Sequence, residues 1–598
     1  MKKLRYIILP CLMVFLASCA EEFIDLTPPA EITDEVYFNE AEHFNAAANR
    51  FYTYLLDWED QGIYSDHGSD LIGYDEDSEM QVYSRGLTQA QANDDYYSDT
   101  YEAIRDINLL ISRAENYDGE ESIVEYVAAT KFHRAWQYFF LIQRYGGVPL
   151  ITEPLTENSE ELYGTRNSRY EVVAQIITDL DDAIAGLPRE QDIASDDKGK
   201  ISKWAAMAFK ADVLLHEATW MKNVGISTDG DGVSEGAGSE GYDPSKIEPY
   251  LQEVITLTKT VMDQGGYELW NYNNVLDNLS HNFLFNLEGS GSNPAGLDKA
   301  TNKEFIFYSK FDFTFRQAGT LVSHVYQGRT KPSRKMMDMF LTTSGLPIDK
   351  PLSGFAGYTN PEDEFENRDL RMRSYFTNHK FLGVIPTIDN DPELRLDGTN
   401  KFGYFNSKFM SWKWGTDEAY RATATESYDM PHIRLAEVYL MYAEALYELN
   451  DAITDGELNE SINLVRDRAG LPALTNAFVA ANNLDMLNEI RRERTIELFA
   501  EGATRFNDLK RWGLAEAELG ETIFGAVIEG TVYENNTAIY KPEVYGYGEG
   551  VAETGVGERR AVIVQPASIR NFSRDNYLFP LPTSQTGLNA NLPQNPGY

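Results

Sequence analysis

Apolar residues recur at helical spacing through much of the first half of the chain. A first helix is expected over residues 101–114, where Tyr101, Ile104, Asn108 and Ile111 follow this spacing. A second is expected over 122–145, because the pattern stops at Gly146-Gly147-Val148-Pro149, which holds two helix breakers and a turn former. These two segments predict a pair of neighbouring helices.

The same pattern continues towards residue 265. Helices are expected over 169–187, which ends before Pro188, over 203–219 with Ser202 as N-cap, and over 249–265. Helix pairs of this length with short Gly/Pro turns suggest tetratricopeptide-like units, although the full repeat consensus is absent. The predicted fold class is mainly α, a tetratricopeptide-like helix-pair scaffold with an irregular, loop-rich part and a few short strands.

Two stretches interrupt the helical pattern. Residues 225–241 are rich in Gly, Ser, Asp and Glu; Asp229 and Asp231 have calcium-loop spacing, but Val233 occupies the next ligand position, which favours a flexible surface loop. Residues 267–430 are mixed, with a strand-like alternation over 304–315 and many turn residues. Binding residues often lie on such loops when a rigid scaffold holds them.

Helical patterning returns at Pro431 in the last third of the chain. One apolar stripe is formed by Leu435, Val438, Tyr442, Leu446 and Leu449. Further helices are expected over 458–468 and 485–500, and the remainder down to Tyr598 is expected to be irregular. We therefore expect one domain over 41–598, with a helical part over 41–265, an irregular part over 266–430 and a second helical part with a tail over 431–598.

The charge of the chain excludes one broad class of partner. The 598 residues include 52 Lys and Arg against 94 Asp and Glu, a formal net charge of −42. Such a charge repels phosphate backbones, so no nucleic-acid binding is expected. The 36 Tyr and 30 Phe exceed what a plain core needs and offer amphipathic rings for a ligand, although most are expected to pack internally.

The N-terminus predicts a lipid anchor. A basic start at Lys2, Lys3 and Arg5 is followed by an apolar run over 6–16, and Leu16-Ala17-Ser18-Cys19 has the pattern of a bacterial lipobox. Residues 1–18 are then a signal peptide that is removed, Cys19 is lipidated, and 19–40 is a linker. The only other cysteine, Cys11, lies in the removed segment, so no disulfide is expected.

Catalytic motifs are missing where they would be easy to see. The chain has no Gly-x-Ser-x-Gly elbow, phosphate loop or dinucleotide fingerprint, and its eight histidines give no zinc spacing. We predict no catalytic residue, no metal ligand and no cofactor, with calcium left open. The abundant carboxylates leave a glycosidase pair as an alternative.

One row of acidic residues calls for a structural explanation. Glu489, Glu493, Glu497 and Glu501 stand at four-residue intervals, so like charges would share a helix face and repel. Arginines are near enough to neutralise them: Arg491, Arg492, Arg494, Arg505 and Arg511. We expect an ion-pair lattice between helices rather than a catalytic site.

Several segments in order along the chain resemble one family, the SusD/RagB outer-membrane nutrient-binding lipoproteins. They are the lipobox followed by Phe23-Ile24-Asp25-Leu26, the helix Arg434 to Ala445, Asn463 to Pro472, Ile490 to Arg494, Asp508-Leu509-Lys510-Arg511-Trp512-Gly513, Leu578 to Pro582, and Gln594 to Tyr598. The resemblance implies a mainly helical protein at the cell surface of the outer membrane. It also implies that the protein captures an oligosaccharide and passes it uncut to a SusC-like TonB-dependent transporter.

The resemblance and the chemistry of sugars together suggest binding residues. A sugar is bound by a stacked aromatic ring and by carboxylate, amide or guanidinium partners. The candidates in the irregular stretch before the first expected helix are Asp70, Arg85, Tyr96 and Tyr97, of which Tyr97 stands where the family often has a tryptophan. The candidates in the middle part are Arg316 and Tyr326, with Trp270, Trp412 and Trp414 as unranked alternatives.

Two alternative functions remain open at this point. The same scaffold would also serve the capture of peptides or another nutrient. A surface glycoside hydrolase that uses two of the many carboxylates is the alternative from a different class.

Overall fold

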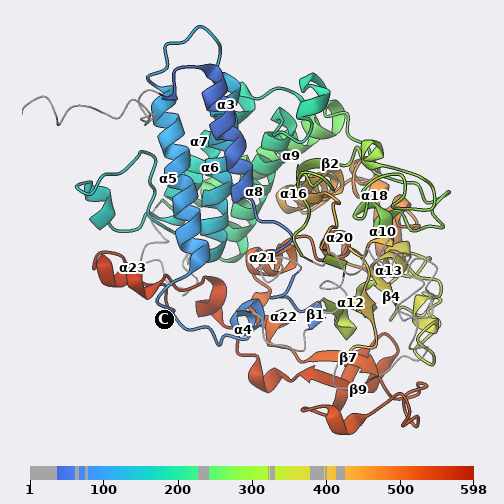
Figure 1. Ribbon diagram of the computed structural model, residues 1–598. Coiled ribbons are helices and arrows are strands. Elements are labelled where there is room, and N and C mark those ends of the chain that lie inside the picture. Colours follow the sequence, from blue (N-terminus) through green and yellow to red (C-terminus); the bar gives the residue numbers. More distant parts are fainter. Residues whose placement is uncertain are drawn as a thin grey trace, which may run out of the picture.

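The structure is a computed structural model in which a helical half lies beside a half built of short elements (Figure 1). It describes residues 37–60, 66–73, 79–225, 241–320, 322–323, 330–377, 396, 400–412 and 424–598. The signal peptide, Cys19, the 226–240 part of the Gly-rich insertion, Tyr326 and Trp414 lie outside these residues.

The helical half consists of long helices that pack side by side in chain order, α5 on α6, α6 on α7, α7 on α8 and α8 on α9. They are α3 (Ala41–Arg50), α5 (Asp95–Ala114), α6 (Val124–Tyr145), α7 (Arg169–Gly186), α8 (Lys203–Asn223) and α9 (Ile247–Gln264). The predicted helices from 122 to 265 are thereby confirmed. The mainly α, tetratricopeptide-like scaffold is the fold that the sequence predicted.

The central helix α6 ends in the interior, where its last carbonyl groups need partners. Arg169 donates to the carbonyl of Ile142 at 3.1 Å and Lys510 to that of Gln143 at 2.9 Å. Arg166 donates to the carbonyl of Tyr145 at 2.9 Å. Three cations therefore satisfy one helix end and complement its negative dipole, which joins α6 to α7 and to the C-terminal part.

The first expected helix was placed too late in the sequence. Helix α5 begins at Asp95, because Asp94 caps it by accepting a hydrogen bond from the backbone N–H of Tyr96 at 3.0 Å. The predicted start at residue 101 was wrong, and Tyr96 and Tyr97 lie in the first turn of a helix instead of an irregular stretch. Helices α3 and α4 (Glu79–Ser84), which the pattern did not predict, precede it.

The middle part is built of short elements, as expected. Its helices are α10 (Ser280–Leu284), α12 (Arg334–Met339) and α13 (Leu370–Tyr375). Two-residue strands pair antiparallel, β1 (Ile72–Gly73) with β3 (Lys331–Pro332) and β4 (Phe376–Thr377) with β5 (Phe405–Asn406). The alternating run over 304–315 forms β2 only over Phe305–Ser309, and a tight turn at 312–316 follows.

The segment 431–434 is a strand, so the prediction that a helix begins at Pro431 was wrong. Strand β6 (Met430–Arg434) pairs antiparallel with β2, and helix α16 (Leu435–Asn450) begins one residue later. Arg434 keeps an extended backbone at the helix start. The pairing with β2, about 125 residues earlier in the chain, is a tertiary contact that local periodicity does not report.

The C-terminal helices are shorter than the pattern suggested. The expected helix over 458–468 is divided into α17 (Asp455–Asn459) and α18 (Ile462–Arg468), and the hydroxyl of Ser461 donates back to the carbonyl of Glu457 at 2.6 Å at the break. Helix α20 (Met486–Glu497) ends at Glu497 instead of residue 500. Two further helices follow, α21 (Thr504–Arg511) and α22 (Ala515–Gly520).

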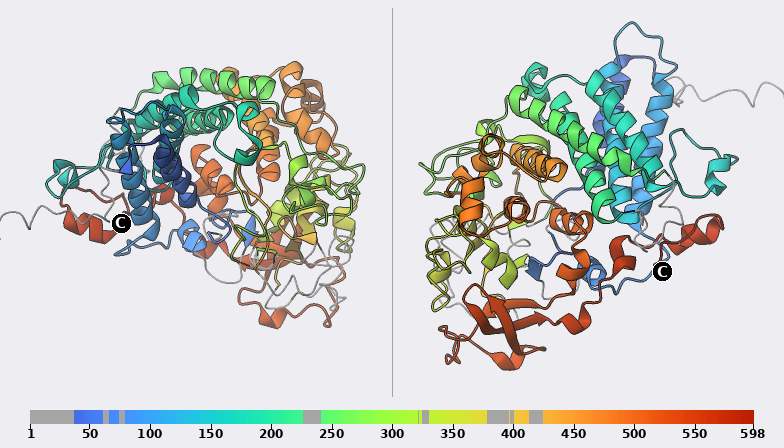
Figure 2. Two further views of the ribbon diagram at one scale, coloured as in Figure 1. Left: turned by 45° about the horizontal axis from the view of Figure 1, so that its top comes forward. Right: turned by 180° about the vertical axis from the view of Figure 1, so that it is seen from behind.

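The tail contains a sheet that the sequence analysis missed. Strands β7 (Ile523–Val527), β9 (Gly557–Gln565) and β8 (Glu549–Thr554) form an antiparallel sheet in the order β7-β9-β8, and α23 (Thr583–Leu588) comes near the end. In both views of Figure 2 this sheet lies at the edge of the molecule away from α3 and α5. The expectation of an irregular tail was therefore wrong for helices α21 and α22 and for the strands over 523–527 and 549–565.

The predicted ion-pair lattice is present, and Glu497 is its centre. This fully buried carboxylate accepts from Arg468 at 2.6 Å, from Arg434 at 2.7 Å and from Arg371 at 2.8 Å. Burial alone would raise the pKa of Glu497, but the charges of Arg468 and Arg434 outweigh it and hold the pKa well below its usual value. These partners join α13, β6 and α18 to α20.

The pairs differ from those that the sequence suggested. Glu493 is paired with Arg371 at 2.6 Å, and Glu501 lies beyond the end of α20, where Arg434 contacts it at 2.6 Å. Of the five arginines proposed as partners, Arg492 contacts a member of the row, Glu489, at 3.4 Å. The others contact acids elsewhere, such as Glu448, Asp508, Asp70 and Glu444.

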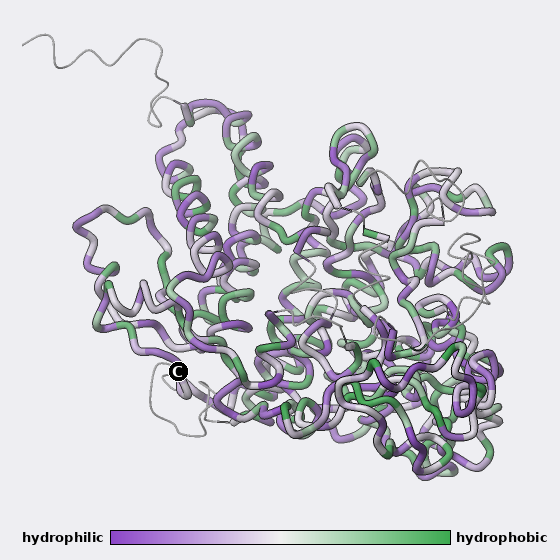
Figure 3. The backbone as a smooth tube through the Cα atoms, turned by 60° about the horizontal axis from the view of Figure 1, so that its bottom comes forward, coloured by the Kyte–Doolittle hydropathy of each residue, from purple (hydrophilic) through white to green (hydrophobic). Residues whose placement is uncertain are grey.

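The hydropathy of the residues along the helices agrees with a scaffold of amphipathic helices. Hydrophilic and hydrophobic positions alternate along most helices in Figure 3. Within the described ranges, no helix combines the length and the apolar character that crossing a bilayer requires.

Removal of the central carboxylate should destabilise the folded protein. Glu497→Ala leaves three buried guanidinium groups without their shared partner, and we expect it to lower the free energy of unfolding by about 3–5 kcal/mol. Urea denaturation followed by circular dichroism measures this loss. Glu268→Ala, which removes an exposed partner of Lys303, is the control and should cost less than about 1 kcal/mol. Equal losses in the two variants would contradict a central role for Glu497.

Candidate ligand-binding site

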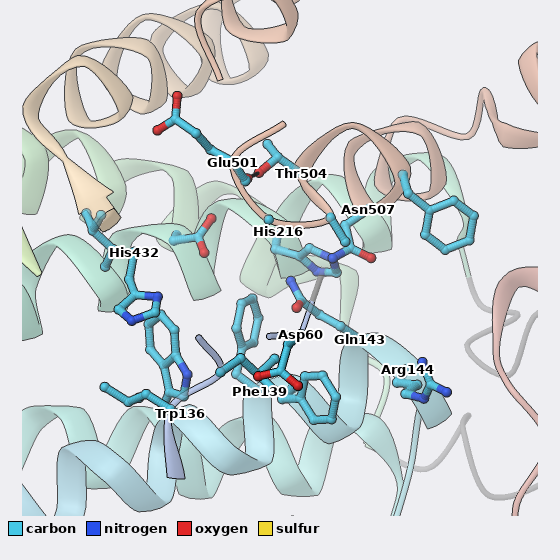
Figure 4. A pocket seen from close by; sticks show the side chains of 18 of the residues that line it. Asp60, Trp136, Phe139, Gln143, Arg144, His216, His432, Glu501, Thr504 and Asn507 are labelled. Carbon is cyan, nitrogen blue, oxygen red and sulfur yellow. Dashed lines mark hydrogen bonds between the residues drawn. The ribbon is translucent and has the colours of Figure 1, made fainter. Parts of the chain in front are cut away.

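A cavity of about 430 Å³ opens between α5, α6, strand β6 and the start of α21. Figure 4 shows Trp136 and His432 together at one end, and Gln143 and Asn507 towards the other. Asp60, from the segment that follows the 3-10 turn at Phe51–Tyr54, reaches towards the centre. The cavity therefore combines aromatic faces with amide and carboxylate groups.

Tyr96 lies on the wall of the cavity that α5 and α6 share. The centre of its ring lies 6.2 Å from the ring centre of Phe140, and the guanidinium of Arg144 lies 4.9 Å from the centre of the Tyr96 ring. Burial and the charges of Asp60 and Glu79 raise the pKa of Tyr96 to about 12, so its hydroxyl stays protonated. Asp94 also contacts Arg144, at 3.5 Å, which helps hold this wall in place.

Trp136 and His432 form the opposite end. Their ring centres are 5.7 Å apart in an edge-on arrangement, and the ring centre of Phe307 lies 5.1 Å from that of Trp136. Burial and the nearby charge of Arg316 lower the pKa of His432 to about 3, so the imidazole is neutral at physiological pH. It shares a hydrogen bond of 2.8 Å with the hydroxyl of Ser309, which fixes the ring.

Two carboxylates on the cavity wall belong to the helix packing. Burial and the charge of Asp212 raise the pKa of Glu437 to about 7, against the charge of Arg494 at 3.3 Å. Burial raises the pKa of Asp212 to about 6, against the charges of Arg494 and Arg511. Both acids are therefore coupled to arginines that also bind Asp508 on α21.

A second hollow of about 260 Å³ adjoins the cavity, and Ser309, the partner of His432, lines it. We call it the second hollow and define it by Asn49, Tyr52, residues 196–200, Tyr308, Ser309, Lys310 and Arg316. Arg316 contacts Asp57 at 3.3 Å and lies 4.4 Å from the ring of Phe311. The segment 51–60 thus separates two neighbouring concave surfaces.

This arrangement is suited to recognition. Flat rings beside amide, hydroxyl and charged groups match a ligand that has both an apolar face and a polar rim. Among the described residues, no three His, Cys, Asp or Glu side chains are grouped as metal ligands would be.

Comparison with known proteins identifies the family. The model described as the SusD family matches residues 309–598, and one described as "Starch-binding associating with outer membrane" matches residues 22–215. The chain belongs to the SusD/RagB family. The resemblance inferred from the sequence motifs is confirmed.

Known members of the SusD/RagB family extend over nearly the same length. The SusD-like protein P25 of Formosa agariphila is 24% identical over 532 residues, which cover 86% of this chain and 90% of that protein. A solved SusD-like protein from Bacteroides fragilis has a TM-score of 0.68 at 21% identity and covers 96% of this chain and 100% of its own. A solved SusD-like carbohydrate-binding protein of the same species has a TM-score of 0.65 at 22% identity, with 93% and 100% covered. These structures share the fold.

Two of the predicted site residues of this SusD-family chain lie at the concave surfaces. Tyr96 lines the cavity and Arg316 lines the second hollow. Tyr326 lies outside the described residues. The structure therefore places one predicted side chain at each surface, and their contact with a ligand stays a prediction.

The other three predicted residues lie in the interior. Asp70 is 3% exposed and contacts Arg505 and Lys335, both at 2.9 Å; burial would raise its pKa, but these two cations hold the pKa well below its usual value. Tyr97 is 5% exposed and packs edge-on against Tyr145. Arg85 is buried and donates to the carbonyl of Gln81 at 3.2 Å. In this structure these three side chains serve the packing.

Neither of the two alternative tryptophans that the structure describes, Trp270 and Trp412, lines the cavity or the second hollow. Trp270 is 2% exposed and its indole donates to the hydroxyl of Thr301 at 3.0 Å, so it belongs to the core. Trp412 is partly buried beside the same core cluster.

Sequence reasoning missed Trp136, Phe140, Asp60 and His432. One signal could have found part of this set, because Trp136, Phe140, Gln143 and Arg144 follow helical spacing and form one face of α6. His432 and Asp60 gave no such signal, since strand pairing and an irregular segment bring them to the cavity.

The raised pKa of Glu437 predicts a pH dependence of stability. The folded state keeps this proton up to about pH 7, whereas an unfolded Glu releases it near pH 4.3, so the contribution of Glu437 falls as the pH rises through that window. Glu437→Gln has no such proton to lose. The free energy of unfolding of the variant should therefore rise relative to that of the wild type between pH 4.5 and 7, by an amount on the order of 1 kcal/mol per pH unit. Urea unfolding at pH 4.5, 6 and 7.5 measures the difference.

The exposed Glu248 on α9 provides the control, and Glu248→Gln should show a flat difference from the wild type over the same pH values. A flat or declining difference for Glu437→Gln would contradict a carboxyl group that is protonated in the folded cavity.

Proposed function

We propose that this SusD-family chain is a cell-surface glycan-binding lipoprotein that captures oligosaccharides and delivers them to a SusC-like TonB-dependent transporter in the outer membrane. The observation that carries the proposal is the cavity between α5, α6 and β6, with aromatic rings at its walls and hydrogen-bonding side chains between them. Family membership supports it, because one matching family model is described as starch-binding and a solved relative with the same fold is named carbohydrate-binding.

The chemistry of sugars explains why such a cavity suits them. A pyranose ring has an apolar C–H face that stacks on an aromatic ring and a rim of hydroxyls that needs donors and acceptors. Tyr96, Phe140 and Trp136 supply partly exposed rings on the cavity wall. Asp60, Gln143 and Asn507 supply acceptors and donors within the same space.

The proposed function is capture without cleavage. Hydrolysis of a glycoside requires two carboxyl groups aimed at one bond. Two of the cavity acids whose pKa is raised, Asp212 and Glu437, lie next to Arg494, which holds helices α16, α20 and α21 together. This ion pairing supports a structural use of the carboxylates.

The lipobox supports the location. Acylation of Cys19 would attach the chain to the outer membrane through its lipid, and the linker up to residue 40 would leave the folded part in the water phase at the cell surface. A domain held next to a transporter in this way meets its partner at a high effective concentration. The partner in this proposal is the SusC-like barrel.

Replacement of the ring at the cavity wall should weaken glycan binding. Tyr96→Ala removes a stacking face, so isothermal titration against a panel of oligosaccharides should show affinity for the bound member reduced about ten-fold. Tyr96→Phe keeps the face and should stay within about three-fold of the wild type. Tyr163→Ala removes an exposed ring remote from the cavity lining and is the control.

The same panel tests the class of ligand. Binding to peptides alone would contradict glycan capture, and reproducible cleavage of an oligosaccharide by the pure protein would contradict a non-catalytic role. Product analysis after incubation, by mass spectrometry, measures cleavage directly.

The transporter partnership predicts a stable complex. A TonB-dependent barrel should co-purify with the tagged protein from membranes solubilised in mild detergent. A second lipoprotein that carries the same tag and anchor serves as the control and should not recover the barrel. Mass spectrometry of the eluate identifies the partner, and repeated absence of a barrel under these conditions would contradict the partnership.

A further inference from the structure

The second hollow has a charge opposite to that of the chain. Four of its lining residues are cationic, Lys198, Lys200, Lys310 and Arg316, whereas two are acidic, Asp196 and Asp197. The whole sequence has the reverse balance, 52 basic residues against 94 acidic ones. A basic concave surface on such an acidic protein is a place where an anion is attracted while the rest of the surface repels it.

Among these four cations, Lys310 is the one whose charge is least neutralised by a neighbouring acidic side chain. Its ammonium donates to the backbone carbonyl of Lys198 at 3.1 Å, and no carboxylate of the described residues lies within ion-pair distance. The other three each contact one acid, Lys198 with Glu190, Lys200 with Asp197 and Arg316 with Asp57. These pairs are partly exposed to solvent, which screens them, so these cations remain able to contact a ligand.

The shape of the second hollow is set by its backbone. Gly199 has a φ of +103°, a conformation that side-chain-bearing residues rarely adopt, between Lys198 and Lys200. A Cβ at this position would lie 3.4 Å from the side chain of Lys310 and 3.6 Å from the hydroxyl oxygen of Tyr308. The loop therefore approaches strand β2 closely, and the lysines of both segments border one concavity.

An exposed aromatic turn continues directly from Lys310. Phe313 is 60% and Phe315 is 91% exposed, although such rings normally pack inside. The turn is held firmly, because Asp312 accepts from the N–H groups of Thr314 and Phe315 at 2.7 and 3.1 Å and its own N–H donates to the carbonyl of Arg316 at 2.7 Å. This turn joins Lys310 to Arg316, which both line the hollow, so its exposed rings and the cations of the hollow are available to one ligand.

We propose that the second hollow, together with Phe313 and Phe315, binds an anionic saccharide. This inference rests on the proposed glycan capture and specifies its substrate class. Lys310 pairs with a uronate carboxylate or a sulfate ester, Lys198, Lys200 and Arg316 add to the attraction, and the rings contact the apolar face of a neighbouring sugar. The acidic remainder of the protein repels anions elsewhere, so the hollow also orients the bound saccharide.

Matched saccharides test the proposal. Isothermal titration of the full-length protein in detergent uses trigalacturonate and its neutral methyl ester, then sulfated κ-neocarratetraose and the same tetrasaccharide after desulfation. At least one charged member should bind about ten-fold more tightly than its neutral match, and the difference should shrink between 50 and 500 mM salt. The two pairs distinguish a carboxylate from a sulfate ester.

Variants connect the effect to this hollow. Lys310→Met should weaken the charged ligand about ten-fold and leave the neutral one unchanged, and Lys310→Arg should restore binding to within about three-fold. Phe315→Ala should weaken charged and neutral members alike. Lys303→Met removes an equal charge outside the hollow and should change nothing.

Equal affinity for charged and neutral sugars, or unchanged binding by Lys310→Met, would overturn the anion site and leave neutral glycan capture standing. Failure of Lys310→Arg to restore what Lys310→Met loses would also overturn it. Unchanged sugar binding by Phe315→Ala and Lys310→Met with reduced recovery of the barrel would assign this surface to the protein partner instead. Absence of binding to any saccharide would overturn both the anion site and the proposed function.

Discussion

The packing of this protein depends on one buried electrostatic requirement, the neutralisation of the acidic face of α20. Glu493 and Glu497 are almost completely buried, and an unpaired carboxylate in that position would cost several kcal/mol. Arg371, Arg434, Arg466 and Arg468 supply the compensating charge from three other parts of the chain. Arg371 belongs to the middle part and reaches α20 only when that part is folded against the C-terminal helices, so the lattice specifies how the two parts meet.

That requirement also positions the candidate site. Arg434, which contacts Glu497 and Glu501, is the last residue of β6, and His432 lies two residues before it on the cavity wall. On the opposite wall, α6 is held at its C-terminal end by Arg166, Arg169 and Lys510. The cavity thus lies between two walls whose positions are determined by buried cations. Such a rigid frame lets loops at the rim vary without disturbing the fold.

The distribution of charge suggests a division of labour between core and surface. Many of the arginines are used in the interior against carboxylates, which leaves the exterior acidic. Against this background the lysines of the second hollow stand out, because Lys310 and Lys200 lie at a concave surface next to exposed aromatic rings. A strongly negative exterior around a small basic surface favours selectivity for the sign and position of a charge on the ligand.

The sequence by itself determined the helical scaffold from residue 122 to 265, the lipobox, the family motifs and the existence of an ion-pair lattice, because each depends on local periodicity or on spacing within one segment. Only the tertiary structure decided that 431–434 is a strand, that Asp70 and Tyr97 are buried, and that Trp136 and His432 meet at a cavity. Strand β6 needs β2 as its partner, and Asp70 needs Arg505 about 435 residues away. Contacts over such separations depend on how whole segments pack together, and no local pattern of residues contains that information.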